Sequence, residues 1–340
     1  MRRISLLYVY GHSHANVHEL RIISRRSKAK GMKINMKTEN NRNLNVIILA
    51  TFIFCFAIRF FEALQLRFDE TILDENFVHK LSGILALVIV LRFVQLTWKE
   101  IGFGFKRFYI PVLLGLGLGT ARFIIGYGVE YAILSAQGAN PSFSFFLSSF
   151  SVVGVHTMLP GYYIVLFCVF NLINAVMEEG LFRGLFIKLA KRKYSFAIAN
   201  IASALLFGIW HIVMPIRSWI DGAMTLQTMV LYSIGYIFLS GSIALMWGML
   251  FEMSGVVWIG LADHFFNNAV INLLHISTDS GMDEMMIART LIAQLSALAL
   301  ISVLYMNKQK KLALCPYIPY VKYFPLSSRR AYSENKKDLE

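Results

Sequence analysis

Apolar residues gather into eight long runs along this chain, and short polar segments separate them. Each run approaches the roughly 20 residues that an α-helix needs to cross the hydrocarbon core of a bilayer. The pattern therefore predicts eight membrane-spanning helices. They cover 44–61, 81–97, 109–127, 161–189, 196–214, 226–250, 256–275 and 286–306.

Composition supports this interpretation, since 56% of the 340 residues are hydrophobic, 16% are charged and the mean hydropathy is +0.57. We predict an all-α, polytopic helical membrane protein with one membrane domain over 44–306, preceded by a disordered tail, 1–43, and followed by a second tail, 307–340. The third run carries Gly115, Gly117 and Gly119, as close helix packing in membranes favours. The uncharged stretch 131–160 is interpreted as an interfacial or partly re-entrant connection.

The net charge of +13 lies entirely in the two tails. Ten basic and two acidic residues give +8 over 1–43, and eight basic and three acidic residues give +5 over 307–340. The loops after the second and fourth runs are also basic, whereas those after the first and seventh runs are acid-rich. Basic segments of this kind indicate cytoplasmic termini in a multi-pass cell-membrane protein beside anionic lipid, and they argue against nucleic-acid binding.

Charged residues interrupt the fourth run at Glu178-Glu179-Gly180-Leu181-Phe182-Arg183. A charge inside hydrocarbon costs about 2.5–3.5 kcal/mol on insertion scales, so it usually marks function. Glu179 and Arg183 are four residues apart and can pair on one helix face. Glu178 points about 100° away, which leaves it free of that pairing. Arg59, near the end of the first run, can extend to the interface.

Two further polar motifs follow, Phe207-Gly208-Ile209-Trp210-His211 in the fifth run and His264-Phe265-Phe266-Asn267-Asn268 in the seventh. Glu178 and His211 are equally distant from the turn at Tyr194 and Ser195, about 25 Å at 1.5 Å per residue, so a helical hairpin places them level. His264 and Asn268 share a helix face, which Asn272 and His275 extend.

These side chains together suit peptide hydrolysis. Glu178 can take a proton from water that His211 also binds, while His264 and Asn268 donate to the oxyanion. Glu179 and Arg183 would hold Glu178 in position. Glu178, His211 and His264 also match a zinc ligand set, although the His-Glu-x-x-His motif is absent, so metal dependence stays open.

The three motifs, in this order, resemble the CPBP family of intramembrane proteases, which includes the CAAX proteases and bacteriocin-processing enzymes also called the Abi family. The resemblance covers about 160–275 and implies an intramembrane metalloendopeptidase-like protease. It implies Glu178 and His211 as the water-activating pair, and His264 with Asn268 as metal ligands or oxyanion donors. A membrane-anchored substrate, prenylated or not, is the implied partner.

Two other functions fit the same residues. A non-catalytic membrane protein that binds a peptide for immunity needs the polar cluster but no reaction. A proton-coupled transporter also uses buried Glu, His and Asn, although no matching pair of broken helices is evident. For an enzyme of this orientation, we expect the substrate to reach the site from the middle of the membrane or from the cytoplasmic side.

Overall fold

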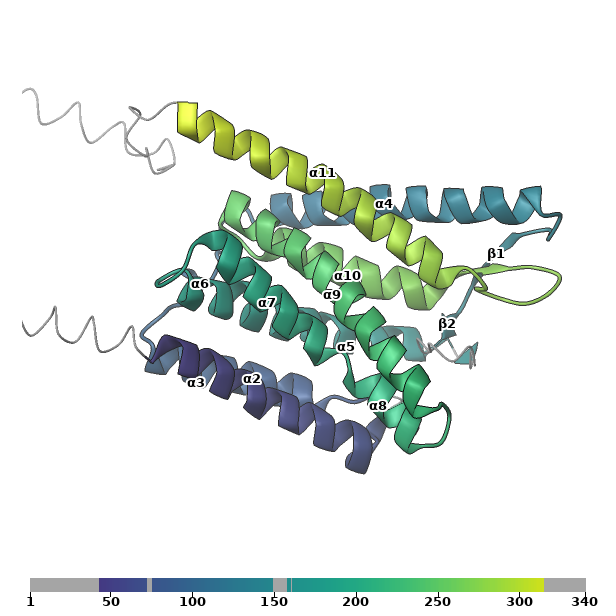
Figure 1. Cartoon of the computed structure of the whole chain (residues 1–340), viewed down its shortest axis with the longest axis horizontal. Helices are drawn as coiled ribbons and strands as arrows, with labels where there is room; N and C mark the ends of the chain where they lie inside the picture. The colour runs from purple at the N-terminus through teal and green to yellow at the C-terminus, as the bar shows by residue number, and fades with distance from the viewer. Residues whose placement is uncertain (1–42, 72–74, 149–157, 160, 315–340) are drawn as a thin grey trace, which may run out of the picture.

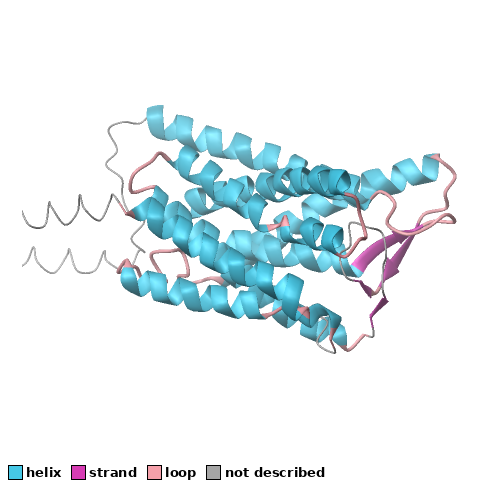
Figure 2. Cartoon of the chain, turned by 60° about the horizontal axis from the view of Figure 1, so that its bottom comes forward, coloured by secondary structure: helices cyan, strands magenta, loops and turns pink. Residues whose placement is uncertain are grey.

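A computed structural model describes residues 43–71, 75–148, 158–159 and 161–314 of the chain. Long helices lie side by side, and short strands cluster at one end of the bundle (Figures 1 and 2). We call the end of the bundle with the strands the strand end. Helix α2 begins and α11 ends at the opposite end, which we call the tail end (Figure 1).

Every predicted run contains a helix, but the count of eight spans is only partly supported. Six segments in the described residues are long and apolar enough to cross a membrane. The second and seventh runs correspond to shorter helices of 16 residues, α3 and α10. The six segments are Leu44–Glu70, Tyr109–Ala136, Tyr163–Ala190, Phe196–Ile220, Leu226–Ser254 and Met286–Lys310.

The chain forms ten α-helices in the described residues, together with two π-helices and one 3-10 helix. The elements are α2 (Leu44–Phe61), the π-helix η1 (Glu62–Leu66), the 3-10 helix η2 (Phe68–Glu70), α3 (Val78–Phe93), α4 (Tyr109–Ala136), α5 (Tyr163–Glu178), the π-helix η3 (Glu179–Phe186), α6 (Ile187–Ala190), α7 (Phe196–Trp210), α8 (Val213–Ile220), α9 (Leu226–Ser254), α10 (Trp258–Leu273) and α11 (Met286–Leu314).

The connection predicted over 131–160 contains more regular structure than expected. Its first residues continue α4 to Ala136, and strands β1 (Ser142–Phe145), β2 (Leu147–Ser148) and β3 (Met158–Leu159) follow. Strand β1 pairs antiparallel with β4 (Leu274–Ser277), while β2 pairs with β3. Residues 149–157 and 160 lie outside the described residues, so the re-entrant interpretation of that part stays a prediction.

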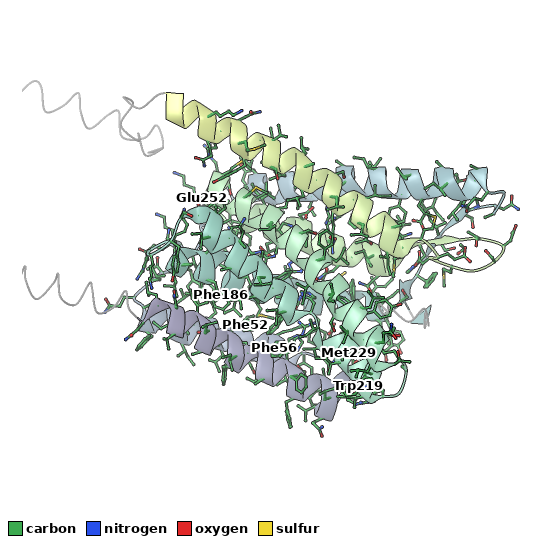
Figure 3. The ribbon with its side chains drawn as sticks, in the orientation of Figure 1. Phe52, Phe56, Phe186, Trp219, Met229 and Glu252 are labelled. Carbon is green, nitrogen blue, oxygen red and sulfur yellow. The ribbon has the colours of Figure 1, made fainter. Side chains whose placement is uncertain are left out.

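Aromatic side chains fill the tail-end half of the bundle. Phe52 on α2 packs edge-on against Phe182, whose ring in turn meets those of Phe186 and Phe207 at 5.3 and 5.1 Å. Phe52, Phe56 and Phe186 lie in the space between α2 and the neighbouring helices (Figure 3). These contacts join α2, η3 and α7.

The glycines of α4 allow close helix contact at two of the three predicted positions. A Cβ atom on Gly115 would lie 2.3 Å from the carbonyl oxygen of Ile259, and one on Gly119 would lie 2.6 Å from the ring of Phe266. Gly117 has nothing within 4 Å, so the packing interpretation is wrong for that residue. Helix α4 therefore packs against α10 through one face only.

A buried ionic cluster joins α4, β4 and α11 at the strand end. Arg289 donates to Glu130 at 2.8 Å and to Asp283 at 3.0 Å, and Asp283 also lies 2.5 Å from His275. Burial raises the pKa of Asp283, but the hydrogen bond from His275 and the charge of Arg289 outweigh it and lower the pKa overall.

Gly115→Ala should destabilise the bundle, because the added methyl group meets a backbone carbonyl that cannot move independently. Overpacking of this kind costs roughly 1–3 kcal/mol. We expect a lower thermal unfolding midpoint in detergent for Gly115→Ala. Gly117→Ala, on the same helix and open on all sides, is the matched control and should unfold like wild type. Equal midpoints for the two variants would contradict the α4–α10 contact.

Candidate active site

One cavity of about 400 Å³ is lined by all four residues predicted to be catalytic, Glu178, His211, His264 and Asn268. Glu178 ends α5, His211 follows α7 directly, and His264 and Asn268 lie on α10. The expected convergence of three sequence motifs is therefore present in the structure. The catalytic role of each residue stays a prediction.

Glu178 is buried and touches three other helices or helix ends. Its Oε1 accepts a hydrogen bond from Trp210 Nε1 at 2.7 Å and lies 3.4 Å from Arg59. Its Oε2 lies 3.4 Å from His264 Nε2. Glu178 stays outside the Glu179–Arg183 pair, as predicted. The side chain of Arg59 was expected at the interface, but it turns inward to Glu178. A cation from α2 balances the carboxylate instead, and its guanidinium lies 4.7 Å from the centre of the Trp210 ring.

Glu179 and Arg183 form the predicted pair, with Glu179 Oε2 at 3.3 Å from Arg183 Nε. The guanidinium is buried over the rings of Phe207 and Trp247, at 4.0 and 4.8 Å from their centres. The segment that follows Glu178 is a π-helix, which the sequence pattern did not predict. Wider turns of this kind often occur at functional sites. Here the π-helix carries the whole second half of the motif.

His264 contacts both carboxylates. Its Nδ1 lies 3.0 Å from Glu179 Oε1, while Nε2 faces Glu178. The imidazole stacks on Trp247 with ring centres 4.4 Å apart. Glu179 therefore orients the imidazole as well as pairing with Arg183, a role that helix spacing alone did not reveal.

His211 lies at a break in the chain rather than within a helix. The predicted run 196–214 divides into α7 and α8, and His211 caps the end of α7. Its Nδ1 donates to the carbonyl oxygen of Phe207 at 2.8 Å, which fixes the ring and leaves Nε2 as its second polar atom. The contact between Trp210 and Glu178 agrees with the prediction that His211 and Glu178 lie at one level.

Asn268 belongs to a chain of side-chain amides in the cavity wall. It donates to Asn171 Oδ1 at 3.0 Å, and Asn171 donates to the carbonyl oxygen of Phe265 at 2.9 Å. Asn272 donates to the carbonyl oxygen of Asn268 at 2.7 Å. One N–H of Asn268 is therefore engaged on the wall, and the amide group has a second N–H.

One histidine lies elsewhere than predicted, and another lies at a helix start outside the three motifs. His275 does not extend the face of His264, because α10 ends at Leu273 and His275 lies on β4 beside Asp283. His79 lies in the first turn of α3, where Glu62 accepts from its backbone N–H at 2.8 Å and lies 2.6 Å from its ring nitrogen.

Several residues at the site were missed from sequence. Arg122 on α4 binds both carboxylate oxygens of Asp263, at 3.1 and 3.2 Å, and also donates to Asn267 at 2.9 Å. Trp247 donates to Asp263 at 2.7 Å. The sequence did contain a hint of these contacts. Arg59 and Arg122 are each a lone arginine inside an apolar run, and such a charge needs a buried partner. The partner itself depends on helix packing.

The predicted zinc ligands, Glu178, His211 and His264, do not fit a metal site in this arrangement. Within the described parts of the chain, no group of three or more His, Cys, Asp or Glu side chains is placed to hold a metal ion. Arg59 lies beside the Glu178 carboxylate that would bind the metal, and its positive charge opposes a second cation there.

Comparison with known protein families gives a match to the family described as type II CAAX prenyl endopeptidase, Rce1-like, over residues 160–270. A search among curated proteins gave no match. The matched segment contains all three motifs and every residue that the motifs placed at the cavity. The match over residues 160–270 of this integral membrane protein agrees with the resemblance of its three motifs to the CPBP family of CAAX proteases.

Proposed function

We propose that this protein is an intramembrane endopeptidase that hydrolyses a peptide bond of a membrane-anchored or lipidated substrate. The observation that carries the proposal is the shared cavity: a buried carboxylate and two imidazoles, from three motifs, line one space large enough for a peptide segment. The Rce1-like match over 160–270 supports the reaction class.

In the proposed mechanism, Glu178 acts as general base. Its Oε1 is held by Trp210 and Arg59, so Oε2 is the oxygen available to a water molecule. As the water oxygen attacks the carbonyl carbon, one water proton passes to Glu178 and then to the leaving amine. The other proton stays on the new carboxyl group, which ionises afterwards. His211, with Nδ1 fixed by a backbone carbonyl, binds the same water through Nε2.

The developing oxyanion needs donors that are already in place. We assign this role to His264 in its imidazolium form, with Nδ1–H donating to Glu179 and Nε2–H to the oxyanion, and to the second N–H of Asn268. Glu179 holds the His264 ring through Nδ1, and Arg183 holds Glu179. Fixed donors of this kind stabilise a transition state without the cost of reorientation.

Glu178→Gln should abolish hydrolysis, because the amide keeps the shape of the side chain but cannot accept the proton. General-base catalysis contributes about 10²–10⁴-fold, so we expect a loss of at least that size in kcat. The assay is cleavage of a membrane-anchored peptide by the full chain in proteoliposomes, with monodispersity as the test of folding. Glu252→Gln, in the Lys191 ion pair at the tail end, is the matched control.

Full cleavage by Glu178→Gln would overturn this mechanism. Peptide binding with no cleavage by wild type would instead favour a non-catalytic binding protein. Proton flux driven by a solute would favour a transporter.

Arg59 is proposed as a positioning residue for Glu178. Arg59→Leu should lower kcat about tenfold to a hundredfold, the range expected when a reacting group shifts slightly, with a smaller change in KM. Arg59→Lys keeps the charge and should recover part of the activity. Arg92→Leu, an exposed arginine at the end of α3, is the control. Unchanged kcat in a folded Arg59→Leu variant would contradict the role.

Metal dependence is tested by chelation. Because Arg59 lies beside Glu178 and the donors do not form a ligand group, we expect activity to persist after EDTA treatment and dialysis. Elemental analysis of the purified protein provides a second readout. Loss of activity that stoichiometric zinc restores would show that the site rearranges to bind the metal.

A further inference from the structure

Arg122 on α4 lies behind the cavity wall and outside the matched residues 160–270. Its side chain is buried and binds both carboxylate oxygens of Asp263, at 3.1 and 3.2 Å, and neither residue lines the cavity. Helix α4 comes this close to α10 (Figure 1) because Gly119 has no side chain: a Cβ atom there would lie 3.1 Å from Asp263 Oδ1. The two bonds to one carboxylate hold the guanidinium in a single orientation.

The guanidinium also determines how the Asn267 amide is turned. Arg122 Nη2 donates to Asn267 Oδ1 at 2.9 Å. An arginine side chain has only donors, so Asn267 must turn its oxygen toward Arg122 and its nitrogen away. That nitrogen donates to Asn268 Oδ1 at 3.2 Å. The orientation of one amide therefore determines the orientation of the next.

The chain of hydrogen bonds continues in the same direction to a backbone carbonyl. Asn268 Nδ2 donates to Asn171 Oδ1 at 3.0 Å, and Asn171 Nδ2 donates to the carbonyl oxygen of Phe265 at 2.9 Å. The first member of this chain, Arg122, can only donate, and the last, a carbonyl oxygen, can only accept. Turning over any one of the three amides would bring two donors or two acceptors together. All three amides therefore have one favoured orientation.

This orientation decides what Asn268 offers to the cavity that it shares with Glu178. Its oxygen accepts from Asn267, and one of its N–H groups donates to Asn171. The second N–H is the donor that remains. An amide turned the other way would offer its oxygen at that place, and an oxygen repels a developing oxyanion. Asn268 is thus held as a donor by residues behind it.

His264 is connected to Arg122 by a second route. Asp263 Oδ2 accepts from Trp247 Nε1 at 2.7 Å as well as from Arg122. The Trp247 ring stacks on the His264 imidazole, with ring centres 4.4 Å apart and planes inclined by 20°. Through Asp263 and Trp247, Arg122 therefore also supports the other proposed oxyanion donor.

We propose that Arg122 and Asn267 are positioning residues for the oxyanion site. Arg122 sets the direction of the amide chain, and Asn267 transmits that direction to Asn268. This inference rests on the proposed protease function. Because the role concerns a donor that acts in the transition state, loss of either residue should lower kcat and leave KM nearly unchanged.

Asn267→Leu tests the link between Arg122 and Asn268, since leucine has a similar branched shape, no charge and no polar atom. Loss of a whole oxyanion donor costs about 10²–10³-fold in kcat, and a donor that is present but free to turn should cost less. We expect kcat to fall roughly tenfold with KM within about twofold of wild type, measured on a membrane-anchored peptide with the full chain in proteoliposomes.

Asn200→Leu is the matched control. Asn200 is buried on α7, donates to the carbonyl oxygen of Leu245 at 3.0 Å and does not line the cavity. The substitution removes a buried amide and its hydrogen bond in the same way as Asn267→Leu, so it should lower stability to a similar degree. Its kcat should equal that of wild type.

Arg122 is tested by a charge-neutral double variant, because Arg122→Leu alone would leave the Asp263 carboxylate buried without its cation and so destabilise the fold. Arg122→Met combined with Asp263→Asn removes both charges and keeps an acceptor for Trp247. We expect monodisperse protein with kcat lowered at least about tenfold. Arg122→Lys keeps the charge and one donor, and it should retain part of the activity.

A phosphinate peptide gives a readout that a general loss of structure would not change, because its tetrahedral phosphorus carries an anionic oxygen where the oxyanion forms. Asn267→Leu should weaken binding of this analogue roughly tenfold. Binding of the uncleaved substrate peptide, compared between Glu178→Gln and Glu178→Gln combined with Asn267→Leu, should differ by less than about twofold.

Full kcat in monodisperse Asn267→Leu and in the Arg122 double variant would overturn the positioning role and leave the protease proposal standing. An equal loss of kcat in Asn200→Leu would do the same. A changed KM at unchanged kcat would make Asn267 a substrate contact instead and would also overturn the role. If wild type cleaves no peptide, the protease proposal fails and the positioning role fails with it.

Discussion

A carboxylate in the middle of an apolar bundle must find partners, and Glu178 finds them on three other segments. Arg59 comes from α2, Trp210 from α7 and His264 from α10. A charge at this depth costs about 2.5–3.5 kcal/mol without such contacts. The two carboxylate oxygens of Glu178 both need polar partners, and this requirement constrains how α2, α5, α7 and α10 pack together.

The neighbouring carboxylate, Glu179, also links residues of different helices around the cavity. Glu179 contacts Arg183 within its own π-helix and His264 on α10, and Arg183 is fixed between the rings of Phe207 and Trp247. The imidazole is thus held by a residue that does not itself line the cavity. The two glutamates therefore differ in place: Glu178 lines the cavity, whereas Glu179 contacts Arg183 and His264 behind it.

The sequence predicted the helices and the residues of the site better than it predicted their partners. Spacing along one helix is local, so the pair of Glu179 and Arg183 could be derived, and hairpin length placed His211 level with Glu178. Arg59 and Arg122 could be recognised as unexplained charges, but their partners lie 119 and 141 residues away. The π-helix and the break at His211 depend on packing between helices, which the spacing of apolar residues along the sequence does not reveal.

The proposed hydrolysis needs a water molecule next to the Glu178 carboxylate, although this residue lies deep in an apolar bundle. The surroundings of Glu178 differ between the tail side and the strand side. On the tail side of Glu178, the ring of Phe182 packs edge-on against those of Phe52 and Phe186. On the strand side, amides line an open cavity. Glu178 lies where the two halves meet. Trp210 fixes one oxygen of the carboxylate at this position, and the other oxygen faces the cavity side that holds His264. In the proposed mechanism, the scissile peptide bond lies at this boundary.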